Sequence, residues 1–233
     1  MRMILAALTA MIPCCMEQPP ANVYTFEEGV NGCACYEDTS IFSESDFAGG
    51  GTDGIFSGTN AQLNTRRALL KVDLSSIPPG SVVTSVELTL TVEMSGGSYP
   101  DIPYALHAVT RTWSEGGTEG GGFGGYGGAS SPGDTTWVEA SKGEEPWSTP
   151  GGDFVAEASA VANAGYAGQT ALWSGPGLVA DVQRWVDVPD QNHGWIIVSE
   201  WEGERQRVKR FRSSESDSGR PRLTVTVAPP AAR

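Results

Sequence analysis

Residues 82–93 alternate between apolar and polar side chains, and this pattern constrains the fold more than any other feature of the chain. The even-numbered positions carry five Val or Leu residues, joined by Thr84, whereas the odd-numbered positions are mainly Ser, Thr and Glu. A period of two with many β-branched residues is typical of a strand that buries one face. Because the backbone groups of such a strand need partners, the segment predicts a β-sheet domain.

Shorter stretches of the same kind predict six further strands, at 38–43, 67–74, 104–112, 195–199, 208–213 and 222–227. A cluster of turn-forming residues, Ser75 to Gly80, joins the strand at 67–74 to the strand at 82–93, so we expect these two strands to be neighbours. Only the segment 178–186 departs from the pattern, because Val179, Val182 and Val186 recur at helical spacing. We expect one short helix there, at an end of the fold.

Composition narrows the fold class. The chain holds 30 Gly and 15 Pro with only 18% charged residues, which is unlike a coiled coil or a helical bundle. It is 39% hydrophobic with seven Trp, enough for a packed core. Together with the strand pattern, this predicts an all-β fold, an antiparallel β-sandwich of jelly-roll type with one short helix. We expect a single domain over 24–228, after a linker at 16–23 and before a tail at 229–233.

The first fifteen residues are typical of a bacterial signal peptide. Arg2 precedes an apolar run of about ten residues, which leads into Pro13 and two cysteines. The run is shorter than the roughly 20 residues that span a bilayer, and no later stretch approaches that length, so we expect no membrane span. Cys14 or Cys15 is a candidate for the lipid-modified cysteine of a lipoprotein, although we favour plain secretion. The expected location is therefore outside the cell or at its outer surface.

The distribution of charge suggests a ligand class. A net charge of −13 argues against nucleic-acid binding, which needs a basic surface. Eight of the fifteen basic residues nevertheless lie within 205–233. In strands, Arg210 and Arg212 would point the same way, as would Arg67 and Lys71. A row of such cations would suit the carboxylates of an acidic polysaccharide. The alternative is a solvated surface whose ion pairs with acidic neighbours contribute ~0–1 kcal/mol each.

Sugar binding also requires aromatic rings that can stack on the ligand. Trp147, Trp201 and Tyr126 lie near turn residues and are candidates, although Trp147 could instead anchor a tight turn. The other five Trp are expected in the core. Tyr126 lies in a run from Gly116 to Gly128 that has nine glycines in thirteen residues. The run lacks the features of a phosphate-binding loop, and we interpret it as a flexible surface segment, with a ligand-binding loop as the alternative.

Metal and thiol chemistry have weaker signals. Jelly-roll modules frequently hold a structural Ca²⁺ through loop carboxylates and carbonyls. Four aspartates beside turns could supply such ligands, namely Asp38, Asp53, Asp134 and Asp153. Cys33 and Cys35 are too close in sequence for a relaxed disulfide and form only half of a zinc site, so we expect reduced or adventitiously paired thiols in a surface loop.

Catalysis is not expected. The chain contains no Gly-x-Ser-x-Gly elbow, no His-Glu-x-x-His helix and no P-loop. Its 28 acidic residues single out no pair for glycoside hydrolysis, which needs two carboxylates about 5–10 Å apart. His107 and His193 are isolated from each other, and we expect both to be structural.

The run Arg67-Ala-Leu-Leu-Lys-Val-Asp-Leu-Ser-Ser-Ile-Pro-Pro-Gly80, continuing into 86–90, resembles the central signature of DNRLRE-domain proteins. Further stretches resemble the same family in the same order, at 38–41, 147–153, 192–197, 211–215 and 220–226. The resemblance covers roughly 25–227 and implies a secreted bacterial or archaeal jelly-roll module. The family includes carbohydrate-binding modules for alginate-like acidic polysaccharides and disaggregatase-related repeats, and its members are usually non-catalytic. The resemblance also implies structural roles for Glu215 and Arg220 in the closing-strand pattern.

Two functions remain open from the sequence. The leading hypothesis is a secreted, non-catalytic carbohydrate-binding module for an acidic, alginate-like polysaccharide at the cell surface or in the extracellular matrix. The alternative is a structural or adhesive surface protein that self-associates without binding glycan. The acidic composition and the candidate lipid anchor fit both hypotheses equally well.

Overall fold

Antiparallel strands dominate the protein in a computed structural model, which describes residues 21–44, 46–97, 99, 101–120 and 127–228. Within these residues the strands are β1 (Asn22–Glu27), β2 (Tyr36–Phe42), β3 (Phe47–Ala48), β4 (Gly54–Thr59), β5 (Thr65–Val72), β6 (Val83–Ser95), β7 (Ile102–Ala108), β8 (Gly128–Ala129), β9 (Glu139–Ser141), β10 (Glu145–Pro146), β11 (Ala160–Ala164), β12 (Thr170–Ser174), β13 (Trp195–Ser199), β14 (Lys209–Arg212) and β15 (Arg222–Val227). One α-helix, α1 (Pro176–Asp187), precedes a 3-10 turn, η2 (Pro189–Gln191). The predicted all-β fold with one short helix is confirmed. The predicted signal peptide with Cys14 and Cys15, most of the predicted linker and the tail lie outside the described residues.

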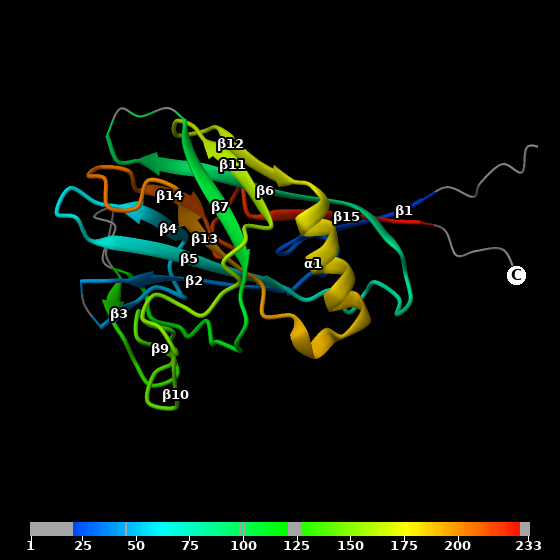
Figure 1. The fold of residues 1–233 in the computed structure, drawn as a ribbon, viewed down its shortest axis with the longest axis horizontal. Helices are drawn as coiled ribbons and strands as arrows, with labels where there is room; N and C mark the ends of the chain where they lie inside the picture. The colour runs from blue at the N-terminus through cyan, green and yellow to red at the C-terminus, as the bar shows by residue number, and fades with distance from the viewer. Residues whose placement is uncertain (1–20, 45, 98, 100, 121–126, 229–233) are drawn as a thin grey trace, which may run out of the picture.

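Eleven strands form one curled sheet in the order β1-β15-β6-β14-β4-β5-β13-β7-β11, with β12 added beside β6 and β2 beside β5. The curl produces two layers that face each other (Figure 1). One layer contains β1, β15, β6 and β12, and the other contains β2, β5, β13, β7 and β11. Strands β14 and β4 connect the layers on one side, and β11 contacts β12 on the other. Because the layers are joined on both sides, the curled sheet has a sandwich-like arrangement.

Strand β6 confirms the alternation found in the sequence, apart from its first residues. Its even-numbered apolar side chains from Val86 to Val92 are buried. Val82, however, is 58% exposed, whereas Val83 is buried. The register with β15 shifts between Thr226 and Val227, and such a β-bulge changes which residue faces the core.

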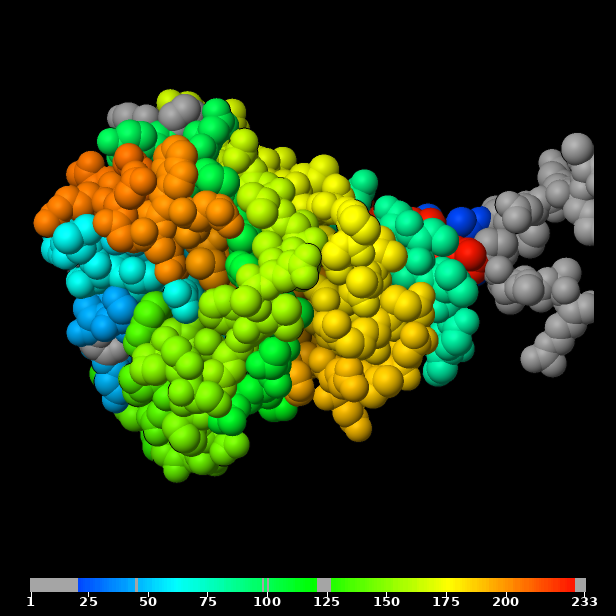
Figure 2. Space-filling model, viewed as in Figure 1, coloured from blue at the N-terminus to red at the C-terminus, as the bar shows by residue number. Residues whose placement is uncertain are grey.

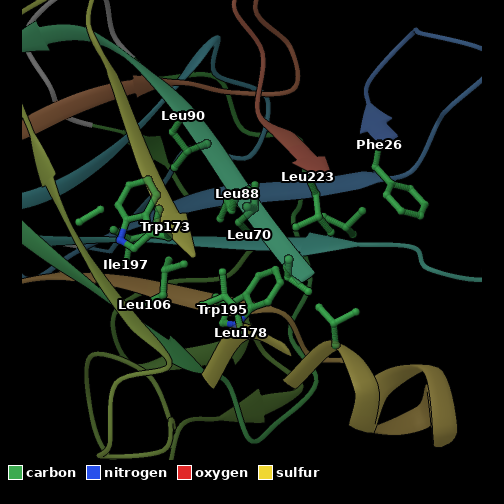
Figure 3. Close-up of a cluster of buried hydrophobic side chains, with 14 of the residues drawn as sticks. Phe26, Leu70, Leu88, Leu90, Leu106, Trp173, Leu178, Trp195, Ile197 and Leu223 are labelled. Atoms are coloured by element: carbon green, nitrogen blue, oxygen red, sulfur yellow. The ribbon is translucent and has the colours of Figure 1, made fainter. Parts of the chain in front are cut away.

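The expectation that the strands at 67–74 and 82–93 are neighbours was wrong. Strand β5 pairs with β2, β4 and β13, whereas β6 pairs with β15, β14 and β12. The connecting residues 73–82 bury Leu74 and Ile77 in the core instead of forming a tight turn. The chain therefore crosses from one layer to the other, and Leu70 of β5 joins Leu88 of β6 in one hydrophobic cluster (Figure 3).

The main core lies between the two layers and is closed by the helix. Trp173 and Trp195 are completely buried within it (Figure 3). Helix α1 contributes Leu178, Val182 and Trp185 to the same cluster, which explains the apolar spacing in its sequence. Asp181 on the same helix accepts a hydrogen bond from the indole N–H of Trp195 at 2.9 Å.

A second, smaller core covers the opposite face of the β2-β5-β13 layer. Ile41, Leu69 and Ile196 project from these strands and pack against Trp113 and Trp147. Both tryptophans belong to the connection between β7 and β11, whose described residues 109–120 and 127–155 are called the loop cap below and carry β8, β9 and β10. Figure 2 shows the loop cap as a lobe beneath β2 and β5. Because this layer is covered on both faces, β5 and β13 are apolar over consecutive residues rather than alternating.

Candidate functional site

The basic side chains proposed to bind a polyanion are already paired with carboxylates. Arg210 is only 6% exposed, and its guanidinium forms ion pairs with Asp53 and Glu93. The guanidinium carbon also lies 5.6 Å from the centre of the Phe56 ring. Arg210 is therefore a buried structural cation with two partners.

Arg212 and Lys71 are held in a similar way. Arg212 shares Glu93 at 4.0 Å and donates a hydrogen bond to the Ser218 carbonyl at 3.0 Å. The ammonium of Lys71 lies 2.6 Å from the Glu37 carboxylate. Since these cations are already compensated, ion pairing with acidic neighbours describes this surface better than a free cationic row.

Arg67, another of the predicted cations, borders an open groove. It makes a bidentate pair with Glu202, with N···O distances of 2.9 and 2.8 Å. Its remaining nitrogen donates to the Gly151 carbonyl at 2.8 Å. The guanidinium also contacts the rings of Trp137 and Phe154, at 5.1 and 5.3 Å from their centres. Arg67 thus fixes the loop cap to the outer face of β5.

The groove beside Arg67 has a volume of about 620 Å³. Its lining comes from β5, the segment after β7 and the turn that follows β10, and consists of Arg67, Thr110, Arg111, Ser148, Thr149, Pro150, Gly152, Asp153 and Phe154. The Asp153 carboxylate accepts hydrogen bonds from the backbone N–H of Ser148 at 2.8 Å and of Thr149 at 3.0 Å. Partial burial acts to raise the pKa of Asp153, but these backbone donors hold it below its usual value. The turn is therefore pinned by its own carboxylate.

Two glycines allow this turn to approach Arg67. Gly151 and Gly152 have φ values of 97° and 101°, in the region that side chains rarely adopt. A Cβ at Gly151 would lie 2.7 Å from Nη1 of Arg67 and 2.9 Å from the Trp137 ring. The backbone N–H of Gly151 donates to the Trp137 carbonyl at 2.6 Å. The Gly-Gly pair therefore sets the position of the groove wall.

The groove is polar but has little excess charge. The Arg111 side chain is 31% exposed, donates to the Pro146 carbonyl, and has its Nε 3.4 Å from the Asp153 carboxylate. Hydroxyl groups of Thr110, Ser148 and Thr149 line the same space. Such a set of donors and acceptors, next to one aromatic ring, can bind a ligand rich in hydroxyl or carboxylate groups.

The aromatic candidates do not form a platform in the described part of the chain. Trp147 is buried in the second core, and its indole N–H donates to the Thr136 carbonyl at 2.9 Å. Its ring therefore anchors the turn, as in the structural alternative, and is not available to a sugar. Tyr126 lies outside the described residues. Trp201 is half-buried and lies 5.3 Å from the guanidinium of Arg207.

The four aspartates proposed as calcium ligands do not come together. Asp53 pairs with Arg210, and Asp153 pins the turn of the groove. Asp134 is buried, and its carboxylate accepts hydrogen bonds from loop residues, including the Gly117 N–H at 3.1 Å. These three side chains are already engaged within the protein. Among the described residues, only Asp38 of the four belongs to a group that could hold a metal ion.

Asp38 instead joins two glutamates that the sequence did not indicate as metal ligands. One carboxylate oxygen from each of Asp38, Glu115 and Glu215 lies within 4.8 Å of the other two. Burial raises the pKa of Asp38 well above its usual value, and the charge of Glu215 adds to this effect. Burial likewise raises the pKa of Glu115 to about 7. The three residues are far apart in the sequence, and Glu215 was expected to be structural, so no local pattern indicated the cluster.

The remaining thiol and imidazole groups have local partners. Cys33 and Cys35 form a disulfide, which corresponds to the paired one of the two states expected from the sequence. His107 lies with Nδ1 2.9 Å from the Val155 carbonyl. Burial lowers the pKa of His193. Neither histidine belongs to a potential metal-binding group within the described ranges.

Comparison with known proteins adds no relative. No family model matches the chain, and no curated protein is significantly similar to it. The resemblance to DNRLRE-domain proteins, and the function that it implies, therefore stay predictions. In the part of the chain that the structure covers, α1 and η2 both lack the length and apolar character needed to cross a bilayer.

Proposed function

We propose that this chain is an extracellular, non-catalytic binding protein for polysaccharide, with acidic chains of the alginate type as its ligand class. The groove between Arg67 and the 148–153 turn is the proposed binding site. The observation that carries the proposal is the lining of this groove, which combines hydroxyl, guanidinium and carboxylate groups with the ring of Phe154.

The chemistry of the lining matches that of a sugar chain. Sugar hydroxyls both donate and accept hydrogen bonds, so they need a wall that offers both kinds of group. Thr110, Ser148 and Thr149 can do either, Arg111 only donates, and Asp153 accepts. A uronate carboxylate could bond to the exposed part of the Arg111 guanidinium. Recognition in this groove would therefore depend mainly on hydrogen bonds.

Because the charges of the groove are already paired, the proposal also predicts how binding depends on salt. Arg67 is paired with Glu202, and Arg111 lies beside Asp153. Binding at the groove should therefore weaken only modestly with added salt, since little uncompensated charge contributes to the attraction. A free row of cations would instead lose most of its affinity between low and physiological ionic strength.

Two variants with matched exposure test the location of the site. Arg111 and Arg212 both have side chains that are 31% exposed, but only Arg111 lines the groove. Calorimetric titration with alginate oligosaccharides should show at least a tenfold loss of affinity for Arg111→Ala and unchanged affinity for Arg212→Ala. Arg210→Ala is unsuitable for this test because Arg210 is buried between two carboxylates.

Three results would count against the proposal. These are an absence of binding to alginate-type chains by the wild type, equal loss of affinity in both variants, and loss confined to Arg212→Ala. Tighter binding to a neutral glucan than to alginate would reject the acidic ligand class. The melting temperature of each variant should be measured alongside, so that unfolding is separated from loss of a contact.

Self-association without glycan is the second candidate function. Val161 of β11 and Leu172 of β12 are both more than half exposed on contacting strands. Exposed apolar side chains on neighbouring strands can form a contact between copies of the chain. Concentration-dependent light scattering that is lost in Leu172→Ser, without glycan binding, would favour this function.

A further inference from the structure

The acidic cluster of Asp38, Glu115 and Glu215 joins three separate parts of the fold. Asp38 lies on β2, Glu115 in the loop cap, and Glu215 in the turn after β14. Two of the carboxylates are held by their neighbours' backbones or hydroxyls. Glu115 accepts a hydrogen bond from the Asp38 N–H at 2.6 Å, and Glu215 accepts one from the Ser214 hydroxyl at 2.9 Å. The first contact links β2 to the loop cap, and the second orients Glu215 within its own turn.

Asp38 has a buried oxygen that nothing in the described chain satisfies. The residue is completely buried, and its Oδ2 accepts a hydrogen bond from the Ser214 N–H at 2.8 Å. Its Oδ1 is also inaccessible to solvent and has no hydrogen-bond partner among the described residues. A buried carboxylate oxygen without a donor is energetically costly, so such an atom usually has a partner of another kind.

The cluster has no ion-pair partner among the described residues. The ion pairs of the described chain include neither Asp38, Glu115 nor Glu215. Lys71 lies opposite Glu37 in the strand pairing and forms an ion pair with it. Its positive charge also acts on Glu115, but less strongly than burial does. The unpartnered oxygen and the absence of an ion pair both point to a bound cation.

We propose that Asp38, Glu115 and Glu215 bind one Ca²⁺ ion. Carboxylate oxygens are the ligands that hard divalent cations prefer. Ca²⁺–oxygen bonds of about 2.3–2.6 Å place opposite ligands roughly 5 Å apart, which accommodates oxygens within 4.8 Å of one another. Asp38 is buried and Glu215 is exposed, so the site opens to solvent on the side of Glu215. Water can complete the six to eight ligands from that side.

Such an ion would connect β2, the loop cap and the turn after β14. Its effect is therefore stabilisation of the folded chain, independent of whether the groove binds polysaccharide. The site differs from the calcium ligands expected from the sequence, of which it retains only Asp38.

Thermal unfolding of the chelator-treated full chain tests the proposal. Added CaCl₂ should raise the melting temperature in a saturable way, by about 5–10 °C at roughly one hundred times the dissociation constant. Calorimetric titration should give one site per chain. Asp38→Asn should abolish the shift, and Glu215→Gln should weaken Ca²⁺ binding at least tenfold. Asp217→Asn removes an exposed carboxylate two residues from Glu215 and should leave the response unchanged.

The proposal has a definite rival, in which the carboxyl groups share protons and bind no metal. That rival predicts no response to Ca²⁺ in the wild type, and this result would overturn the proposal. An unchanged Ca²⁺ response in Glu215→Gln would overturn it as well. Glu215 is exposed, so this variant remains informative even if Asp38→Asn does not fold. A larger shift with MgCl₂ than with CaCl₂ would reject calcium as the ion.

Discussion

Lys209 offers a stability prediction that can be calculated from the structure. Its side chain is completely buried on the inward face of β14. The ammonium donates three hydrogen bonds, to the Ser95 hydroxyl at 2.7 Å, the Tyr99 carbonyl at 2.9 Å and the Gly165 carbonyl at 2.7 Å. It thereby ties β14 to the turns after β6 and β11. The substitution Lys209→Met keeps the apolar stem but removes all three donors.

Burial lowers the pKa of Lys209 from 10.5 to about 8, and this shift determines how the free energy of unfolding depends on pH. Between pH 8 and pH 10.5 the unfolded chain keeps the lysine proton, whereas the folded protein releases it. The free energy of unfolding of the wild type therefore rises with pH in this window, by about 3 kcal/mol for a shift of this size. The methionine variant has no such titration. The difference in the free energy of unfolding between the wild type and the methionine variant should therefore grow by this amount from pH 7.5 to pH 10.5.

The variant should already be less stable at pH 7.5. Each of the three oxygens loses a donor, at a cost of roughly 1–3 kcal/mol apiece, and relief from burying a charge offsets part of this cost. Urea denaturation followed by tryptophan fluorescence at pH 7.5, 9.0 and 10.5 measures both effects. Ser95→Ala serves as the control, because it removes one acceptor and keeps the lysine, so the rise with pH should persist. A wild-type advantage that stays constant or shrinks with pH would refute the reasoning.

Three further substitutions, two of them with a matched control, test contacts that stabilise the fold. Arg210→Ala should destabilise the protein by about 2–4 kcal/mol in urea denaturation, because it removes a buried side chain and leaves the mostly buried Glu93 with only the more distant Arg212. Arg212→Ala should change stability by less than about 1 kcal/mol. Equal effects would contradict the burial assigned to Arg210. Gly151→Ala should cost about 2–3 kcal/mol, since strain at φ 97° adds to the contact with Arg67. Gly80 serves as the control, because its φ of 79° is similar but a Cβ there would meet no atom within 4 Å. Gly80→Ala should therefore cost only about 1 kcal/mol. Equal costs at the two glycines would show that the close contact with Arg67 does not contribute. Asp181→Asn perturbs the hydrogen bonds that the carboxylate accepts from the Trp195 indole, the Ser159 hydroxyl and Arg184, and should lower stability by about 1–3 kcal/mol. A neutral result would show that these bonds do not hold the helix.

The sequence predicted most of the strands because burial along a strand is a local pattern. The strand expected at 195–199 coincides with β13, and the helix expected at 178–186 lies within α1. The pairing of β5 and β6 could not be predicted in the same way. Residues 73–82 look like a turn locally, but Leu74 and Ile77 are buried between the layers and carry the chain across the core. Side-chain burial at a connection depends on the whole fold.

The candidate site was harder to predict because its partners are distant in the chain. Asp53 and Glu93 neutralise Arg210 from 157 and 117 residues away. Alternation along the strand predicted that Arg210 and Arg212 point the same way, and both reach Glu93. The pattern carried no information about the acidic residues opposite them. The same alternation could have predicted the burial of Lys209. It lies two residues before Phe211 on one strand, so both side chains point to the core.

The acidic cluster illustrates the same limit. Glu115 lies 77 residues from Asp38, and the Ser214 that bonds to Asp38 lies 176 residues away. Neither separation corresponds to a recognised metal-binding spacing, so the sequence singled out aspartates beside turns instead. Three of those aspartates are engaged in turns, loops or an ion pair. Only the folded chain brings the three cluster carboxylates together.

The location of the ligand tests the central claim most directly. Two-dimensional amide NMR spectra of the isotope-labelled chain should be recorded during titration with an alginate oligosaccharide. We expect the largest shift changes at residues 110–111 and 148–154, which line the groove, with little change along β14. Changes centred on Arg212 and β14, or no changes at saturating oligosaccharide, would contradict the account.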